Sequence, residues 1–253
     1  MNDPVDPTLA YEDPRFLASD EARPLRIIAE YLDPLRRFRQ LRIHDTIVFF
    51  GSARLSAQGP LGRYYSEARE LARRITAWSM NLPSHVHRYV ICSGGGGGIM
   101  EAANRGASDA GGRTVGLNIS LPHEQRPNRY ITRELSFKFR YFFMRKLWFA
   151  HLARGVVVFP GGYGTLDELM EILTLSQTNK LECRVPIILY GTDYWHEIIN
   201  FQALVRHGMI APEDLGLFQF ADDPATAFEL LTSALEPSAA DKTPAFRRSR
   251  CQS

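Results

Sequence analysis

Cysteine is scarce in this chain. The 253 residues include only Cys92, Cys183 and Cys251, and no two of them have the Cys-x-x-Cys spacing. A sparse, odd count argues against a disulfide framework and against a cysteine-rich zinc site. The seven histidines include one His-x-His pair, His85 and His87, but no His-x-x-x-His or His-Glu-x-x-His spacing. We therefore expect structural or surface histidines and no metal centre.

Strong charge and long apolar runs are missing as well. The formal net charge is +2, which gives no global reason to expect nucleic acid or a membrane surface as a partner. No apolar run is long enough to span a bilayer. The first residues, Met1 to Asp6, are acidic and include no apolar segment of the kind found in secretory signals. These absences favour a cytoplasmic protein.

The chain does contain apolar runs that alternate with helical patterns. Short buried strands are predicted over 46–50, 89–92, 114–119, 130–132, 155–159, 185–190 and 217–220. Helices are predicted over 61–79, 99–111, 136–152 with Ser136 as N-cap, from the turn after residue 160 to 179, 194–207 and 224–235. Near-continuous apolar strands that alternate with helices indicate an α/β fold, a doubly wound, Rossmann-like parallel sheet covered on both faces.

The ends of the chain differ in composition from this central part. Residues 1–45 are predicted to be an N-terminal extension, loosely packed to about residue 22 and continuing as an amphipathic helix over 23–40. Residues 46–236 form the predicted nucleotide-binding catalytic domain, and residues 237–253 are polar and basic, as in a disordered tail. The extension could bind a partner or an allosteric nucleotide, and no sequence feature decides this.

One glycine-rich stretch organises the rest of the chain. Pro160-Gly161-Gly162-Tyr163-Gly164-Thr165-Leu166-Asp167-Glu168 follows a predicted strand and leads into a predicted helix. A turn of this kind presents backbone N–H groups at a helix N-terminus, where the helix dipole favours an anion. The two acids that follow suggest an enzyme for a phosphorylated ligand, although Asp167 is also explained as a helix-start acid.

A second glycine turn, Ser93 to Gly98, follows another predicted strand. Five consecutive glycines let the backbone approach a ligand closely and expose N–H groups to an anion. The stretch fits neither the dinucleotide pattern Gly-x-Gly-x-x-Gly nor a P-loop, and packing alone would require only one or two glycines. A third turn, Gly51-Ser52, is a weaker signal, because a serine that caps its own turn explains it equally well.

The predicted helix over 136–152 is rich in aromatic residues and holds two adjacent cations. Its aromatic side chains are interpreted as core or as a dimer interface. We expect Lys146 to extend to solvent, and Arg145 to have a functional role, because a cation in so apolar a segment needs a partner.

Together these residues resemble the LONELY GUY (LOG) family, the cytokinin riboside 5′-monophosphate phosphoribohydrolases. The stretch from Pro160 to Glu168 matches the family signature PGGxGTxxE, Ser93 to Met100 resembles its upstream glycine loop, and Arg145-Lys146 matches its Arg-Lys pair. The resemblance implies hydrolysis of the N-glycosidic bond of AMP or an N6-modified AMP to free base and ribose 5-phosphate. It also implies a homodimer or higher homo-oligomer.

The resemblance gives each candidate residue a role. Glu168 is the expected catalytic carboxylate and Arg145 its catalytic partner, for phosphate or for charge on the departing base. The expected substrate-binding residues are Gly51, Ser52, Gly94, Gly95, Gly96, Gly97, Gly98, Met100, Lys146, Gly161, Gly162, Gly164 and Thr165. N–H groups and Arg145 meet the charge of the phosphate, so no metal and no cofactor are expected.

Two other functions are weighed against hydrolysis. A non-catalytic nucleotide sensor would need the phosphate-binding turns but not the combination of Arg145 and Glu168. Lysine decarboxylation would need pyridoxal phosphate on a Schiff-base lysine. Lys146 is the only lysine near the predicted site, and nothing around it resembles such a motif, so we reject this function.

Overall fold

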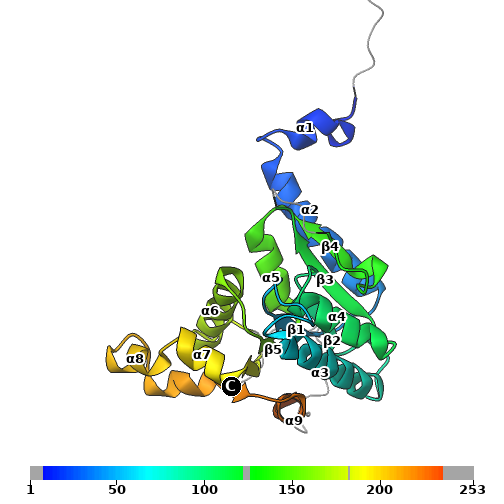
Figure 1. Ribbon diagram of the computed structural model, residues 1–253. Helices are drawn as coiled ribbons and strands as arrows, with labels where there is room; N and C mark the ends of the chain where they lie inside the picture. Colours follow the sequence, from blue (N-terminus) through cyan, green and yellow to red (C-terminus); the bar gives the residue numbers. More distant parts are fainter. Residues whose placement is uncertain (1–7, 122–125, 182, 236–253) are drawn as a thin grey trace, which may run out of the picture.

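A single parallel sheet forms the centre of the computed structural model, which describes residues 8–121, 126–181 and 183–235. Its seven strands lie in the order β4-β3-β2-β1-β5-β6-β7 (Figure 1). The strands are β1 Thr46–Phe50, β2 Val90–Ser93, β3 Thr114–Ile119, β4 Ser136–Phe139, β5 Ala153–Val158, β6 Ile187–Tyr190 and β7 Phe218–Ala221. The sheet and its helices confirm the predicted α/β doubly wound class.

Helices cover both faces of the sheet. They are α1 Pro14–Ala18, α2 Arg23–Gln40, α3 Gly62–Met80, α4 Ile99–Asp109, α5 Phe142–Leu152, α6 Tyr163–Gln177, α7 Thr192–Ile198, α8 Phe201–Arg206 and α9 Pro224–Leu235. Short 3-10 turns occur at η1 Ala10–Glu12, η2 Arg133–Leu135 and η3 Pro212–Leu217. Side chains of α2, α5 and α6 join one buried cluster, and those of α3, α4 and α9 join the other.

Strand β1 shows why the sheet needs two covered faces. All five of its residues are buried, and they alternate between the clusters: Ile47 and Phe49 pack with α3 and α4, whereas Val48 and Phe50 pack on the opposite face. Successive side chains of a strand point to opposite faces. A continuous apolar run is therefore stable only between two helical layers.

Two predictions for the segment before β5 are wrong. The predicted strand 130–132 is a turn, and the predicted helix over 136–152 is strand β4 followed by helix α5. In β4, Phe137 and Phe139 are buried while Lys138 is exposed, the alternation of a half-covered edge strand. Ser136 therefore begins a strand and caps no helix. Aromatic residues are compatible with both a strand and an apolar helix, so the sequence pattern did not reveal that burial alternates every second residue along β4.

The predicted helix 194–207 is also wrong as a single element. It is divided into α7 and α8, with Ile199 and Asn200 between them. The Asn200 side chain accepts a hydrogen bond from the Ala203 backbone N–H at 2.8 Å and caps α8. The other predicted elements of the central part agree with the structure to within a few residues.

At the N-terminal side, the predicted amphipathic helix 23–40 is confirmed as α2. The loosely packed segment before it holds η1 and α1, which have no buried residue. Residues 1–7 and the tail predicted over 237–253 lie outside the described residues. Cys92 is buried and free.

Candidate active site

The three predicted turns meet where the strand order reverses. From β1 the chain builds the sheet outward to β4 and then returns to β5, directly beside β1. Open α/β sheets bind ligands at such a point, beyond the carboxyl ends of the strands. Here Gly51-Ser52 follows β1, Gly94 to Gly98 follows β2, and Pro160 to Thr165 follows β5.

The backbone of Ser52 joins these turns. Its N–H donates to the Pro160 carbonyl at 3.0 Å, and its carbonyl accepts from the Ile99 N–H, at the start of α4, at 3.1 Å. The Ser52 Oγ accepts from the Arg54 N–H at 3.1 Å. The serine that caps its own turn is therefore the arrangement that the structure shows, and a substrate contact from Ser52 stays a prediction.

Close packing explains some of the glycines but not others. A Cβ at Gly98, which has a φ of 62°, would lie 2.2 Å from the Ser52 carbonyl oxygen, and one at Gly161 would lie 2.1 Å from Thr165 Oγ1. At Gly162 and Gly164 a Cβ would meet nothing within 4 Å. Packing thus requires Gly98 and Gly161, while Gly162 and Gly164 leave open space beside the N-terminus of α6.

A network of hydrogen bonds from the side chains of Ser93, Asn104 and Asn128 holds the backbone of the 94–98 turn. Ser93 Oγ accepts from the Gly95 N–H at 3.1 Å and donates to Asn104 Oδ1 at 2.7 Å. The Asn128 side-chain amide donates to the carbonyls of Gly95 and Gly96 at 3.2 and 3.0 Å. The N–H groups of Gly96 and Gly97 have no acceptor within the described part of the chain. They are therefore free to bind an anion.

Arg145 and Glu168 form an ion pair between α5 and α6. Arg145 Nη2 donates to Glu168 Oε1, and the two side chains are only 13% and 11% exposed. Burial raises the pKa of Glu168, and the charge and hydrogen bond of Arg145 offset this only in part. Both residues also act on Cys92 in β2, whose pKa is raised by burial and by the Glu168 charge and lowered by Arg145. The pair is therefore near enough to Cys92 in β2 to affect its pKa.

Arg145 keeps hydrogen-bonding capacity beyond this pair. Its Nε is buried and has no hydrogen-bond partner among the described residues. The guanidinium lies 5.8 Å from the ring centroid of Phe142 and 5.3 Å from that of Phe149. An aromatic surrounding with one unused N–H suits a guanidinium that binds a further group.

The side chain of Lys146 does not lie where the sequence predicted. Its Nζ lies 2.8 Å from Asp167 Oδ1 and 3.0 Å from Glu171 Oε2, and the side chain is 19% exposed. Burial opposes its charge, but the hydrogen bonds to Asp167 and Glu171 raise its pKa. The expectation that Lys146 extends to solvent is therefore wrong, and a substrate contact from it stays a prediction. Because α6 begins at Tyr163, Asp167 is not a helix-start acid; it pairs with Lys146 instead.

The other predicted substrate contacts lie around the same turns. Met100 is half-buried, and its Sδ would lie 2.7 Å from a Cβ at Gly94. Thr165 is buried at the start of α6. Their contacts with substrate are still predictions.

Two positioning groups were missed by the sequence argument. Asn128 lies between the predicted strands 114–119 and 130–132 and was given no role, and Tyr194, in α7, donates its hydroxyl hydrogen to the Gly161 carbonyl at 2.7 Å. Each side chain binds a turn that is distant from it in sequence. Only the Pro-Asn pair at 127–128 gave a local turn signal.

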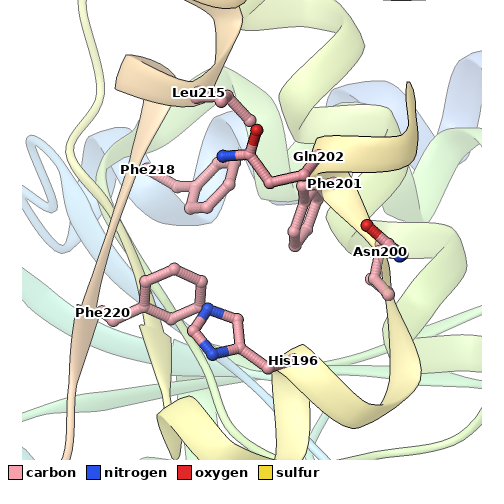
Figure 2. Close-up of a pocket in the computed structure, with 8 residues that line it drawn as sticks. His196, Asn200, Phe201, Gln202, Leu215, Phe218 and Phe220 are labelled. Carbon is pink, nitrogen blue, oxygen red and sulfur yellow. The ribbon is translucent and has the colours of Figure 1, made fainter. Parts of the chain in front are cut away.

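A pocket of about 290 Å³ lies elsewhere, around α7, α8, η3 and the edge strand β7. Figure 2 shows its aromatic walls, which include Phe201, Phe218 and Phe220, with His196 beside them. His196 packs edge-on against Phe220, and the Asn200 oxygen is used to cap α8. No carboxylate and no Lys or Arg lines it, so we place the candidate site at the glycine turns and not in this pocket.

Two properties of the described residues concern membranes and metal ions. None of the helices within the described residues is both long and apolar enough to cross a membrane. In the same part of the chain, no three His, Cys, Asp or Glu side chains gather as the ligands of a metal ion would.

Comparisons with known proteins show the family to which this chain is similar. A family model described as possible lysine decarboxylase matches residues 100–231. The cytokinin riboside 5′-monophosphate phosphoribohydrolase LOG3 of Arabidopsis thaliana is 27% identical over 162 residues, 62% of this chain and 69% of the relative. The enzyme LOG of Oryza sativa subsp. japonica is 29% identical over 180 residues, 69% of this chain and 67% of the relative.

A solved structure gives the same fold. The X-ray structure of TM1055 superposes with a TM-score of 0.53 and 22% identity, over 75% of this chain and 99% of that one. The family model covers about half of the chain, including both the Arg145–Glu168 pair and the turn at Pro160. This chain therefore belongs to the family described as possible lysine decarboxylases, the LOG family.

Proposed function

We propose that this protein hydrolyses the N-glycosidic bond of a nucleoside 5′-monophosphate, AMP or an N6-modified AMP such as a cytokinin riboside monophosphate, to free base and ribose 5-phosphate. The observation that carries the proposal is the buried Arg145–Glu168 pair beside the glycine turns. The names of the relatives, which are phosphoribohydrolases, support a hydrolase of this class.

The phosphate binds to the glycine turns. Gly96 and Gly97 offer unpaired N–H groups, and the first turn of α6 offers others beside Gly162 and Gly164, where the backbone is open. The positive ends of the α4 and α6 dipoles favour an anion there. A phosphate held in this way fixes the ribose relative to Glu168, so that the reaction occurs in one geometry.

Glu168 acts on the ribose and on the attacking water. Cleavage of an N-glycosidic bond passes through an oxocarbenium-like ribose. A carboxylate stabilises that cation and orients or deprotonates the water on the face opposite the base. Burial makes this charge more effective, because the surroundings of Glu168 screen it less than water does.

Arg145 favours the charged form of Glu168, against the burial that raises the pKa of Glu168, and has a second task. Its buried Nε has no partner among the described residues, so it can donate to the phosphate or to the departing base. A planar guanidinium binds two acceptors at once, which suits both tasks. Lys146 does not supply decarboxylase chemistry, because a Schiff-base lysine needs a lowered pKa and its ion pairs raise the pKa.

The test is a substrate panel with matched variants. The wild-type protein is incubated with AMP, N6-prenylated AMP, other nucleoside monophosphates and the nucleosides without phosphate, and free base is measured by chromatography. We expect release from at least one monophosphate and much less from its nucleoside. Glu168→Gln should abolish turnover with a modest loss of binding. Asp167→Asn, which changes the neighbouring acid, should stay active.

A nucleotide sensor is the alternative that this panel excludes or supports. If the wild-type protein binds a monophosphate tightly but releases no base, and Glu168→Gln binds it equally well, the protein is a nucleotide sensor and not a hydrolase. The retained Arg145–Glu168 pair favours hydrolysis, since keeping two charges buried serves no purpose in a site that only binds phosphate.

The working form in this proposal is a homodimer. Helix α5 exposes Phe142, Phe143 and Leu147, and α6 exposes Met170, each by at least 38%. An apolar face on the two helices that carry Arg145 and Glu168 is typical of a subunit interface. A second copy that covers it would shield the catalytic pair from bulk solvent.

A further inference from the structure

Helix α5 carries Arg145, but its own sequence gives its N-terminus no side-chain cap. The N-cap position is Tyr141, whose side chain accepts no hydrogen bond from the helix. The preceding residues, Phe139 and Arg140, are not capping residues either. A helix that must hold a catalytic guanidinium therefore begins without the local interactions that fix a helix start.

The N-terminal extension supplies that interaction from helix α2. The Glu30 carboxylate accepts hydrogen bonds from the Arg140 N–H at 2.7 Å and from the Tyr141 N–H at 3.2 Å. In a capping box, the third residue of a helix makes a similar contact with its own N-cap. Here the acceptor comes from 110 residues upstream in the sequence. Its negative charge also lies at the positive end of the α5 dipole.

A second set of contacts holds α5 farther along its length. Trp148, one turn beyond Arg145, donates its indole N–H to the Glu30 carbonyl at 3.1 Å. The Tyr31 ring stacks on Trp148 at 5.5 Å, and the Phe38 ring packs against it at 5.3 Å. Helix α2 thus contacts the α5 segment at Tyr141 and at Trp148, which lie on either side of Arg145 in the sequence.

We propose that the N-terminal helix α2 positions the catalytic arginine, with Glu30 as the positioning residue that fixes the start of α5. The role of Arg145 in this statement rests on the proposed function. Glu30 and Trp148 hold the Tyr141–Trp148 segment at two points, and this fixes the guanidinium against Glu168. The extension is then part of the catalytic structure and not an appended binding module.

The proposal separates the effects on kcat and on KM. Glu30 binds the start of α5 and, among the described residues, makes no hydrogen bond to the turns at 94–98 and 161–165. A misplaced Arg145 should slow the chemical step about 10- to 100-fold, the range expected for a displacement of the order of 1 Å. Binding through the phosphate turns should remain, so KM should change less than threefold.

The test compares Glu30→Ala, Glu30→Gln and the control Asp20→Asn. Asp20 is an exposed acid shortly before α2 and makes no side-chain contact with α5. Steady-state kinetics on the best monophosphate and amide hydrogen exchange of residues 140–148 are measured for each full-length variant. We expect faster exchange and a lower kcat in Glu30→Ala, partial rescue of both in Glu30→Gln, which keeps one acceptor oxygen, and wild-type values in Asp20→Asn.

Each outcome decides the question. Unchanged exchange at 140–148 in Glu30→Ala would overturn the capping role, and a kcat within twofold of wild type would overturn the positioning role. If Glu30→Ala does not fold, Glu30→Gln provides both measurements. If the wild-type protein turns over no nucleotide, the proposed function fails, and the exchange measurement still decides whether Glu30 fixes the start of α5.

Discussion

Glu168 is a carboxylate whose charge is opposed by its surroundings. Burial raises its pKa above the usual value near 4.5, and Arg145 limits the rise. The proposed reaction needs the ionised form, so the rate should fall as the pH falls through this raised pKa. The acid limb of kcat/KM should therefore lie above the ordinary glutamate range. A pH–rate profile measures it, and a limb at or below pH 4.5 would contradict the assignment.

Asn128 acts through the backbone of the 94–98 turn. Its amide holds the Gly95 and Gly96 carbonyls and so leaves neighbouring N–H groups to the phosphate. Asn128→Ala should raise KM for a monophosphate roughly tenfold, as expected for the loss of two hydrogen bonds in a partly buried network.

Isothermal titration with AMP and with adenosine, on a protein blocked by Glu168→Gln, separates this effect from catalysis. The loss in Asn128→Ala should appear for AMP and not for adenosine. Asn200→Ala, which removes the cap of α8, is the matched control and should bind both as before. Equal losses for the two ligands would mean that Asn128 supports the fold in general and not the phosphate site.

At the scale of elements, Asp45 fixes the starts of β1 and β2. Its buried carboxylate accepts from the Tyr89 N–H at 2.5 Å and pairs with Arg88 at 3.0 Å. Burial opposes its ionisation, but the hydrogen bond from His44, the Arg88 charge and the Tyr89 N–H together lower the pKa of Asp45. Asp45 therefore stabilises the fold above the pKa of an unfolded aspartate and loses this contribution as the pH falls below it.

Asp45→Ala should reduce the free energy of unfolding by about 3 kcal/mol at neutral pH, because the buried N–H and guanidinium lose their partner. Urea unfolding between pH 7 and pH 3 measures the difference from wild type, which should shrink as the pH decreases below about 4. Asp109→Ala removes an exposed pair with Arg69 and should cost less than 1 kcal/mol. A difference independent of pH would show that packing and not charge explains the loss.

The elements also show what the sequence can and cannot predict. Strand β1 is a continuous apolar run, as expected for a strand that is buried on both faces of a sheet, and its bounds were predicted correctly. Strand β4 and helix α5 were predicted as one helix, because aromatic residues suit both a half-buried strand and an apolar helix. The start of α5 is decided by Glu30, more than 100 residues away, and no local pattern contains that information.

At the scale of the whole molecule, the site follows from the strand order. Two turns with phosphate-binding character were predicted from glycine spacing, but their meeting through Ser52 follows from β1 lying between β2 and β5. The catalytic roles of Arg145 and Glu168 were taken from the family resemblance; the structure shows that the two side chains form an ion pair, and their roles stay predictions. The network of Asn128 and the pairing of Lys146 depend on side-chain positions in space, which composition and periodicity do not contain.

The proposed dimer is also a property of the whole molecule. Phe143 is 50% exposed on α5, and placing a charge there should destabilise an apolar interface. We expect light scattering to show twice the mass of the chain for wild type and the mass of one chain for Phe143→Glu. Met209→Glu changes an apolar residue that is 69% exposed near α8 and should remain dimeric. A monomeric wild type would end this part of the proposal.

The most direct measurement is the identification of both products by phosphorus and proton NMR, with the monophosphate that the panel selects. The proposed hydrolysis predicts equal amounts of free base and ribose 5-phosphate, formed by the wild-type protein and not by Glu168→Gln. Release of nucleoside and inorganic phosphate, or no reaction with any monophosphate, would contradict the assignment of Arg145 and Glu168 to N-glycosidic cleavage.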